Sequence, residues 1–302
     1  MLSPSLTSCV IDMAELASLE ADITARWGQP GADVRPLPSD LEARRVSLLK
    51  KYLGGTPILP TPILYVVGDS HSVFFGGAER IIFNKGRRVW TGFFRARYIS
   101  AVTELLPVFR VFHVGPATAW QADERGSSTR AREKIDALLR SGDIPVGAGI
   151  LLVFGEIDCR CHIPKAVLGG STIEMAVNAT VERFMRLPRR LKAAGYTPAV
   201  WLTTLMPICG DVGNPDDSHA LPIIGPQALR DEISLIYCSK LAEACHHVSI
   251  RSVGVPRPPD NIRSTCFLDG HHLSQRMMPE VLSTLVKANI LPLAFAPTPR
   301  PT

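Results

Sequence analysis

The fold is decided by the stretch Ile63-Leu64-Tyr65-Val66-Val67-Gly68-Asp69-Ser70-His71-Ser72. Its unbroken apolar run predicts a strand buried on both faces, and the Gly-Asp-Ser turn that follows predicts the start of a helix. A strand that leads straight into a helix in this way is the opening unit of a parallel sheet.

Short apolar runs alternate with helical patterns along the rest of the chain to about residue 290. Strands are expected over residues 63–67, 108–114, 149–154, 198–204 and 248–253. Helices are expected over residues 71–82, 128–141, 172–194, 226–246 and 276–289, with Ser128, Thr172 and Ser274 at three of their starts. This alternation predicts an α/β fold, a flavodoxin-like αβα sandwich with a parallel five-stranded sheet, whose ligand crevice lies at the carboxyl ends of the strands.

The chain of 302 residues divides into three parts. We expect a helical N-terminal extension over residues 1–60, one α/β domain over residues 61–292, and a flexible proline-rich tail over residues 293–302. The net charge of +5 is small, and its basic stretches at 44–51, 85–97 and 186–192 fit solvated helix faces better than a nucleic-acid surface.

Seven cysteines without regular spacing favour a reduced compartment over a disulfide framework. The first thirty residues lack the apolar core of a signal peptide, and no segment is apolar enough to cross a bilayer. The expected protein is therefore cytoplasmic, with neither a membrane nor a nucleic acid as a partner.

Ser70 follows a buried strand at a turn where free backbone N–H groups can stabilise negative charge. This placement suits a nucleophile, although Asp69 and Ser70 could also serve only as helix caps. Far along the chain, Asp269-Gly270-His271-His272 places a carboxylate and an imidazole on one short turn. The three residue types together supply a nucleophile, a base and a group that orients the base. A capping loop or a metal site remains an alternative for the paired histidines, but no third ligand stands at a defined spacing.

The two motifs, Gly68-Asp69-Ser70 and Asp269-Gly270-His271-His272, resemble those of the SGNH, or GDSL-type, hydrolase family. The resemblance covers about residues 62–290. It implies Ser70 as nucleophile, His272 as base and Asp269 as the acid that orients His272. It also implies the αβα sandwich reached above from the strand pattern.

The same resemblance implies an oxyanion hole, and here the chain departs from the family pattern. Gly115, after the second expected strand, stands where the family has a glycine donor. The family's Gly-x-Asn-Asp turn is replaced by Gly155-Glu156-Ile157-Asp158, so that only Gly155 and Asp158 match and Ile157 takes the position of the asparagine. Arg160 is a candidate substitute, held in place by Asp158 or Glu156.

Cys159, Cys161 and His162 could suggest a metal site, and Cys159 could itself be a thiol nucleophile. A distant pair of ligands is missing from the pattern, and cysteine is more often a small buried apolar residue. We therefore expect no metal and no cofactor.

Three functions follow from these residues. The first is a serine esterase that hydrolyses an O-acyl ester, often acetyl, on a carbohydrate or another small molecule. The second is an acyltransferase that uses the same three residues, and the third is a binding module that has lost turnover together with the asparagine.

Overall fold

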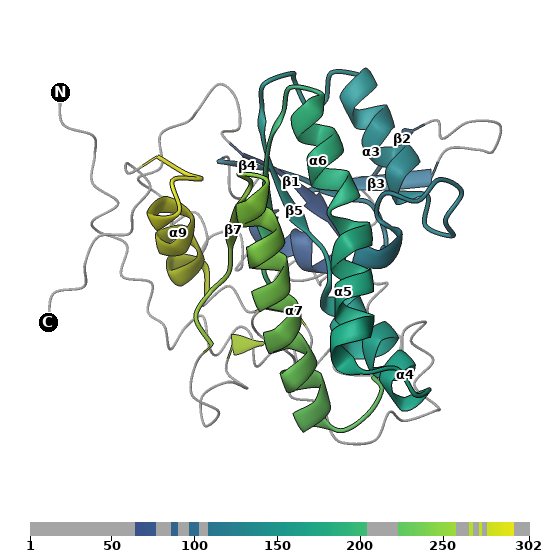
Figure 1. The fold of residues 1–302 in the computed structure, drawn as a ribbon. Coiled ribbons are helices and arrows are strands. Elements are labelled where there is room, and N and C mark those ends of the chain that lie inside the picture. Colours follow the sequence, from purple (N-terminus) through teal and green to yellow (C-terminus); the bar gives the residue numbers. More distant parts are fainter. Residues whose placement is uncertain are drawn as a thin grey trace, which may run out of the picture.

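A computed structural model describes eight stretches of the chain (Figure 1), namely residues 64–76, 86–89, 97–102, 108–203, 223–257, 266–267, 272–273 and 277–292. The expected N-terminal extension over residues 1–60 and the tail over residues 293–302 lie outside the described residues. The same is true of Asp269, Gly270, His271 and Ser274.

The described strands form one seven-stranded sheet in the order β2-β3-β4-β1-β5-β6-β7. Five of them are parallel, namely β1 (Leu64–Gly68), β4 (Phe109–His113), β5 (Gly149–Val153), β6 (Thr197–Trp201) and β7 (Arg251–Val253). Counted in chain order, these five strands run 2-1-3-4-5, which is the flavodoxin-like order. The expected α/β class and its five parallel strands are confirmed.

Two further strands extend the sheet beyond β4, and the sequence analysis missed them. They are β2 (Gly86–Val89) and β3 (Arg97–Val102); β2 pairs antiparallel with β3, and β3 pairs antiparallel with β4. In the described part of the basic stretch 85–97, residues 86–89 form β2 and Arg97 begins β3, so these residues are not on the helix face that we expected. Neither strand carries a long apolar run. Their strand conformation therefore depends on pairing at the β4 edge of the sheet and not on a local sequence pattern.

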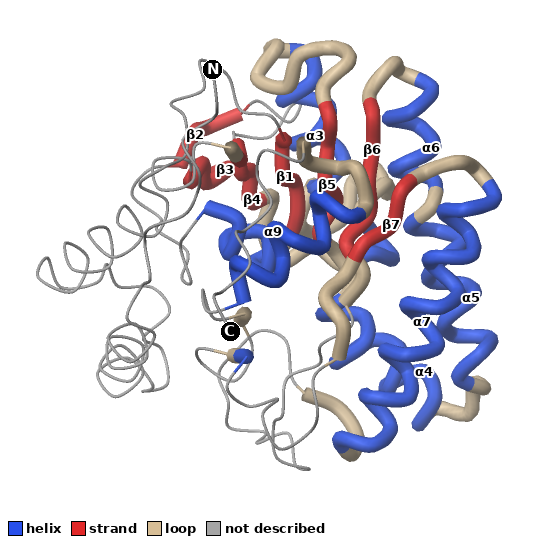
Figure 2. The backbone as a smooth tube through the Cα atoms, turned by 90° about the vertical axis from the view of Figure 1, so that its left-hand side faces the viewer, coloured by secondary structure: helices blue, strands red, loops and turns tan. Residues whose placement is uncertain are grey.

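Helices cover both faces of the sheet (Figure 2). They are α3 (Ala131–Arg140), α4 (Ile163–Leu168), α5 (Ile173–Phe184), α6 (Arg186–Ala193), α7 (Gln227–His247) and α9 (Met278–Lys287). Alternate residues of β1 point to opposite faces. Tyr65 and Val67 pack in the core formed with α3, α5, α6 and α7, whereas Leu64 and Val66 pack in the core formed with α9.

Two expected helices and one expected strand differ in detail. The helix expected over residues 172–194 is divided into α5 and α6, because Pro188 lacks an N–H and its ring would clash with the carbonyl of Phe184. The helix expected over residues 71–82 is a 3-10 helix over Ser70–Gly76 in the described part. The strand expected over residues 248–253 starts at Arg251, because α7 continues to His247.

Two helix starts can be compared with expectation. Thr172 caps α5, and its hydroxyl accepts a hydrogen bond from the Met175 N–H at 3.1 Å. Ser128 does not cap α3, which begins after Arg130, a residue with a φ of 54° and no capping side chain. The π-helical turn Asp158–His162 and α4 were not anticipated by the sequence pattern.

Gly68 ends β1 where the strand approaches β5 most closely. A Cβ atom at this position would lie 2.1 Å from the carbonyl oxygen of Val153. That distance is far inside van der Waals contact, and the obstacle is backbone rather than a movable side chain. Only glycine therefore permits β1 and β5 to keep their register up to the turn that carries Ser70.

We predict that Gly68→Ala lowers the free energy of unfolding by about 3 kcal/mol, the upper end of overpacking costs, because the new methyl group must displace backbone. Chemical denaturation would measure the loss. Gly169→Ala is the matched control, since Gly169 has a φ of −83° and a Cβ there would lie 3.3 Å from its nearest neighbour. Equal stability losses in the two variants would contradict this account of Gly68.

Candidate functional site

Ser70 lies at the carboxyl end of β1, where the strand order of the sheet reverses. Among the parallel strands, β4 and β5 follow β1 in the chain and lie on opposite sides of it, so the connections to them diverge at the carboxyl end of β1. A doubly wound sheet opens its ligand crevice at this point. The Ser70 side chain is partly buried, and its hydroxyl has no hydrogen-bond partner among the described residues.

Asp69 shapes the turn that presents Ser70. Its N–H donates to the Val153 carbonyl at 3.1 Å, and its Oδ1 accepts from the His71 N–H at 2.9 Å. Its own carbonyl accepts from the Ser72 hydroxyl at 2.7 Å. Burial raises the pKa of Asp69 to about 6, and Oδ2 is buried without a partner in the described part of the chain.

Two backbone N–H groups are available after the ends of β1 and β4. The Val114 N–H donates to the Gly68 carbonyl at 2.9 Å, and this bond continues the parallel pairing of β4 with β1 beyond the strand ends. Gly115, whose φ is +102°, stands two residues beyond the end of β4, as Ser70 stands two residues beyond the end of β1. Within the described residues, neither the Gly115 N–H nor the Ser70 N–H has an acceptor.

Glu156 is the charged centre on the β5 side of the crevice. Its Oε1 accepts from Nε of Arg160 at 2.6 Å and its Oε2 from Nη2 at 3.2 Å, so it holds the guanidinium with both oxygens. Oε2 also lies 3.2 Å from Nε2 of His71. Burial alone would raise the pKa of Glu156, but the charges of Arg160 and His71 outweigh burial and hold that pKa below its usual range.

Asp158 does not share in holding Arg160. Its Oδ2 accepts from the Ala119 N–H at 2.6 Å and its Oδ1 from the Trp120 N–H at 3.2 Å. These bonds tie the turn after β5 to the 3-10 helix Ala119–Gln121, which follows Gly115. Burial raises the pKa of Asp158 to about 7, although both N–H groups favour the ionised form. Of the two carboxylates named as supports for Arg160, Glu156 is the one that holds it.

Gly155 is required by packing. Its φ is +110°, and a Cβ there would lie 2.7 Å from the hydroxyl of Tyr237, which α7 packs beneath the turn. Ile157, in the position of the family's asparagine, is 2% exposed and carries no polar side-chain group. A side-chain oxyanion donor is therefore absent from that position.

His272 lies against His71, the residue next to Ser70. The two ring centroids are 5.1 Å apart, with the planes inclined by 38°. An isolated bridge between Phe267 and Leu273 anchors this segment, and both side chains are buried in the core beneath α9. The structure thus places His272 against the residue that follows Ser70, whereas Asp269 lies outside the described residues.

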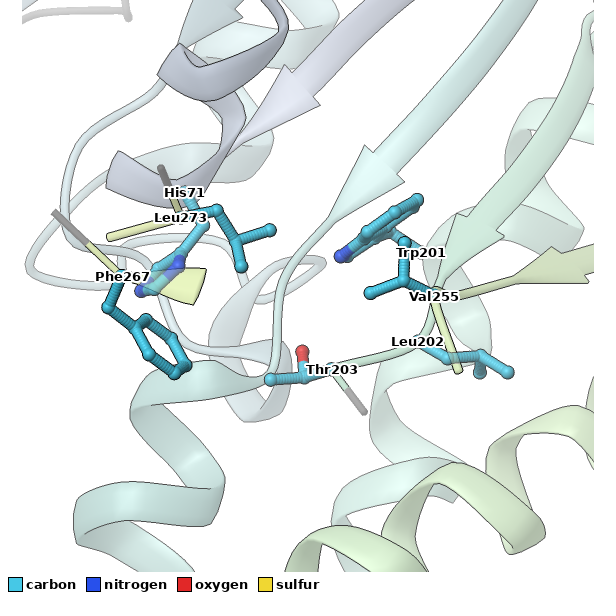
Figure 3. Close-up of a pocket in the computed structure, with 7 residues that line it drawn as sticks. All are labelled: His71, Trp201, Leu202, Thr203, Val255, Phe267 and Leu273. Atoms are coloured by element: carbon cyan, nitrogen blue, oxygen red, sulfur yellow. The ribbon is translucent and has the colours of Figure 1, made fainter. Parts of the chain in front are cut away.

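A small pocket adjoins His71 (Figure 3). Its cavity volume is about 20 Å³, enough for roughly one water molecule. It is lined by His71, Trp201, Leu202, Thr203, Val255, Phe267 and Leu273. The walls are mostly apolar, so the pocket suits a small apolar group rather than a charged one.

The alternative sites at the cysteines gain no support. Cys159 is fully buried, and burial raises the pKa of its thiol well above the usual value, which is the opposite of an activated nucleophile. Within the described residues, no group of three or more His, Cys, Asp or Glu side chains could hold a metal ion. No helix in that part of the chain is both long and apolar enough to cross a membrane.

Sequence reasoning missed the role of His71 and of the Glu156–His71 contact. The pairing of Glu156 with Arg160 had a signal, because residues four apart on a helical turn face each other. His71 had none, since its partner Glu156 comes from the turn after β5, about eighty residues away. Its contact with Glu156 depends on the adjacency of β1 and β5 in the sheet.

No family model and no curated protein matches the chain. Among solved structures, one crystal structure aligns over 73% of this chain and 93% of its own, with 13% sequence identity and a TM-score of 0.38. A likeness at that level carries no argument about fold or function.

We predict that Glu156→Gln destabilises the fold by about 3 kcal/mol at pH 7, because it removes the buried negative charge that both Arg160 and His71 contact. The pKa of Glu156 is lowered in the folded protein, so its contribution is present above the unfolded pKa and is lost as pH falls. The difference from the natural protein should therefore shrink below about pH 4.5.

Denaturation curves across pH would measure this difference. Glu243→Gln is the control, because Glu243 forms only exposed ion pairs with Lys240 and His247. A difference that grew toward low pH would contradict the assignment.

Proposed function

We propose that the chain is a serine esterase of SGNH type that hydrolyses a short O-acyl ester on a carbohydrate or another small molecule. The observation that carries the proposal is the arrangement at the end of β1. Three groups that follow the ends of β1 and β4 have no partner in the described part of the chain, namely the Ser70 hydroxyl, the Ser70 N–H and the Gly115 N–H. The imidazole of His272 lies against His71, the residue next to Ser70. These are the parts needed for nucleophilic acyl transfer.

In this mechanism, Ser70 Oγ attacks the ester carbonyl carbon while His272 takes the hydroxyl proton. Negative charge develops on the carbonyl oxygen, and the Ser70 and Gly115 N–H groups stabilise it. The carbon–oxygen bond to the alcohol then breaks, and the alcohol leaves with the proton from His272. Water, deprotonated by His272, attacks the acyl-Ser70 ester, which releases the carboxylic acid and restores Ser70.

The remaining site residues support this chemistry in our proposal. Asp269 orients His272, as the motif resemblance implies. Arg160, held by both oxygens of Glu156, supplies positive charge where the family's asparagine would stand. Asp158 and Gly155 do not contact the substrate in this proposal. The Asp158 carboxylate holds the segment after β4 through the Ala119 N–H, and Gly155 permits the turn after β5.

His272 rather than His71 is assigned as the base. His71 is paired with a carboxylate, as a catalytic imidazole often is, but it directly follows Ser70 in a 3-10 helix. Side chains of adjacent residues in a helical turn diverge, so His71 does not face the Ser70 hydroxyl. We assign the Glu156–His71 pair to the wall of the crevice.

The first prediction from this function is that Ser70→Ala abolishes hydrolysis of a short-chain nitrophenyl ester and labelling by a fluorophosphonate, with the fold unchanged. Ser72→Ala is the matched control, because Ser72 donates only to the Asp69 carbonyl. It should retain activity within a few-fold. A natural protein that neither hydrolyses the ester nor takes up the probe would overturn the proposal.

The second prediction separates the two histidines. His272→Ala should lower kcat by about 1000-fold or more, as the loss of a general base typically does. His71→Gln should mainly raise KM, because that ring contributes to the pocket wall. Steady-state kinetics on both variants would decide, and the reverse pattern would assign the base to His71.

The third prediction concerns the acyl group. Leu273→Ala enlarges the pocket and should raise the kcat/KM for a butyryl ester relative to an acetyl ester by about 10-fold, since one methylene is typically worth 10- to 200-fold. Leu282→Ala is the control, because both leucines are 7% exposed and share one core, but Leu282 does not line the pocket. An unchanged ratio in Leu273→Ala would remove the pocket from the acyl site.

A further inference from the structure

Lys134 is a buried lysine on α3 that lies behind the proposed oxyanion hole. Its side chain is 4% exposed, and its ammonium group donates a hydrogen bond to the carbonyl of Val114. A Cβ placed on Gly115 would lie 3.2 Å from Lys134 Nζ, so the ammonium sits directly against that glycine. Burying a cation is costly unless it is paired or hydrogen-bonded, and the Val114 carbonyl is one acceptor that Lys134 finds here.

The Val114 carbonyl and the Gly115 N–H belong to the same peptide group. A charged donor on the carbonyl pulls electron density toward the oxygen, and the N–H at the other end becomes a stronger donor. Gly115 is also the residue whose N–H is unpaired among the described residues. Lys134 is thus positioned to polarise the peptide whose N–H the proposed function assigns to the oxyanion hole.

Lys134 supplies positive charge at the β4 side of the proposed oxyanion hole, where the neighbouring His113 does not. Burial, together with the nearby Lys134 and His272, lowers the pKa of His113 to about 3, so His113 is neutral at physiological pH. On the β5 side, Ile157 supplies no side-chain donor. An enzyme that lacks one oxyanion donor typically turns over ~100- to ~1000-fold more slowly.

We propose that Lys134 is a positioning residue for the oxyanion hole, which polarises and orients the 114–115 peptide and so offsets the absent asparagine. This inference rests on the proposed esterase function. Lys134 touches neither the substrate nor the reacting atoms, and it acts through the Gly115 N–H.

The test compares Lys134→Met, which keeps an apolar stem of similar length, with Lys134→Gln, which offers a neutral donor, and Lys134→Arg, which keeps the charge. In ester hydrolysis, Lys134→Met should lower kcat by about 10- to 100-fold, with KM within about 3-fold, because only the transition state carries the oxyanion. Lys134→Gln should be intermediate, and Lys134→Arg should restore most of kcat. The rate of fluorophosphonate labelling should follow kcat.

A direct readout is the NMR signal of the Gly115 amide. Its proton should shift upfield in Lys134→Met and return in Lys134→Arg. This measurement needs no turnover, so it separates the inference from the proposed function. If the natural protein is inactive and unlabelled, the esterase proposal fails, and the catalytic role of Lys134 fails with it.

The natural protein could be active while Lys134→Met has the same kcat and the same Gly115 amide chemical shift as the natural protein. In that case the Lys134 inference fails and the esterase proposal stands. A purely structural role would instead lower stability in step with kcat and would alter KM as well. Should Lys134→Met not fold, Lys134→Gln carries the same comparison. Full activity in a folded Lys134→Gln with an unshifted Gly115 amide would then overturn the inference.

Discussion

The close approach of β1 to β5 is the constraint on which the rest of the site depends. Gly68 leaves the Val153 carbonyl free to accept the Asp69 N–H at 3.1 Å, where any side chain would separate the two strands. Because the strands stay in register to their ends, the turns after them are brought side by side. His71 from one turn and Glu156 from the other can then meet at 3.2 Å.

Ser70 and the fold class could be predicted because both depend on local pattern. The alternation of apolar runs and helical patterns predicts a parallel sheet. In such a sheet, a buried strand followed by Gly-Asp-Ser places Ser70 at the carboxyl end of that strand. Thr172 was found in the same way, by a side chain acting on its own helix. By contrast, β2 and β3 depend on pairing between distant segments. Strands of four and six residues without a long apolar run carry no local sequence pattern that would predict them.

The contacts that distinguish this site could not be predicted, because each joins segments far apart in the chain. Asp158 looked like a crevice residue, but its oxygens are taken by the N–H groups of Ala119 and Trp120. Gly155 matched a motif glycine, yet its immediate constraint is Tyr237 on a distant helix. Lys134 had no signal at all. It belongs to an amphipathic helix, and nothing local distinguishes a buried lysine from a solvated one.

Three buried carboxylates near Ser70 are stabilised in three different ways, and the differences bear on their roles. Glu156 is matched by two basic side chains and Asp158 by two backbone N–H groups, whereas Asp69 has one oxygen without a partner in the described part of the chain. Burial raises the pKa of Asp69 to about 6, so near neutral pH its charge opposes folding. A residue kept at such an electrostatic cost, here next to the proposed nucleophile Ser70, is typical of functional sites rather than of structural turns. The unpaired oxygen of Asp69 therefore supports the interpretation that the end of β1 is built for chemistry and is more than a capped turn.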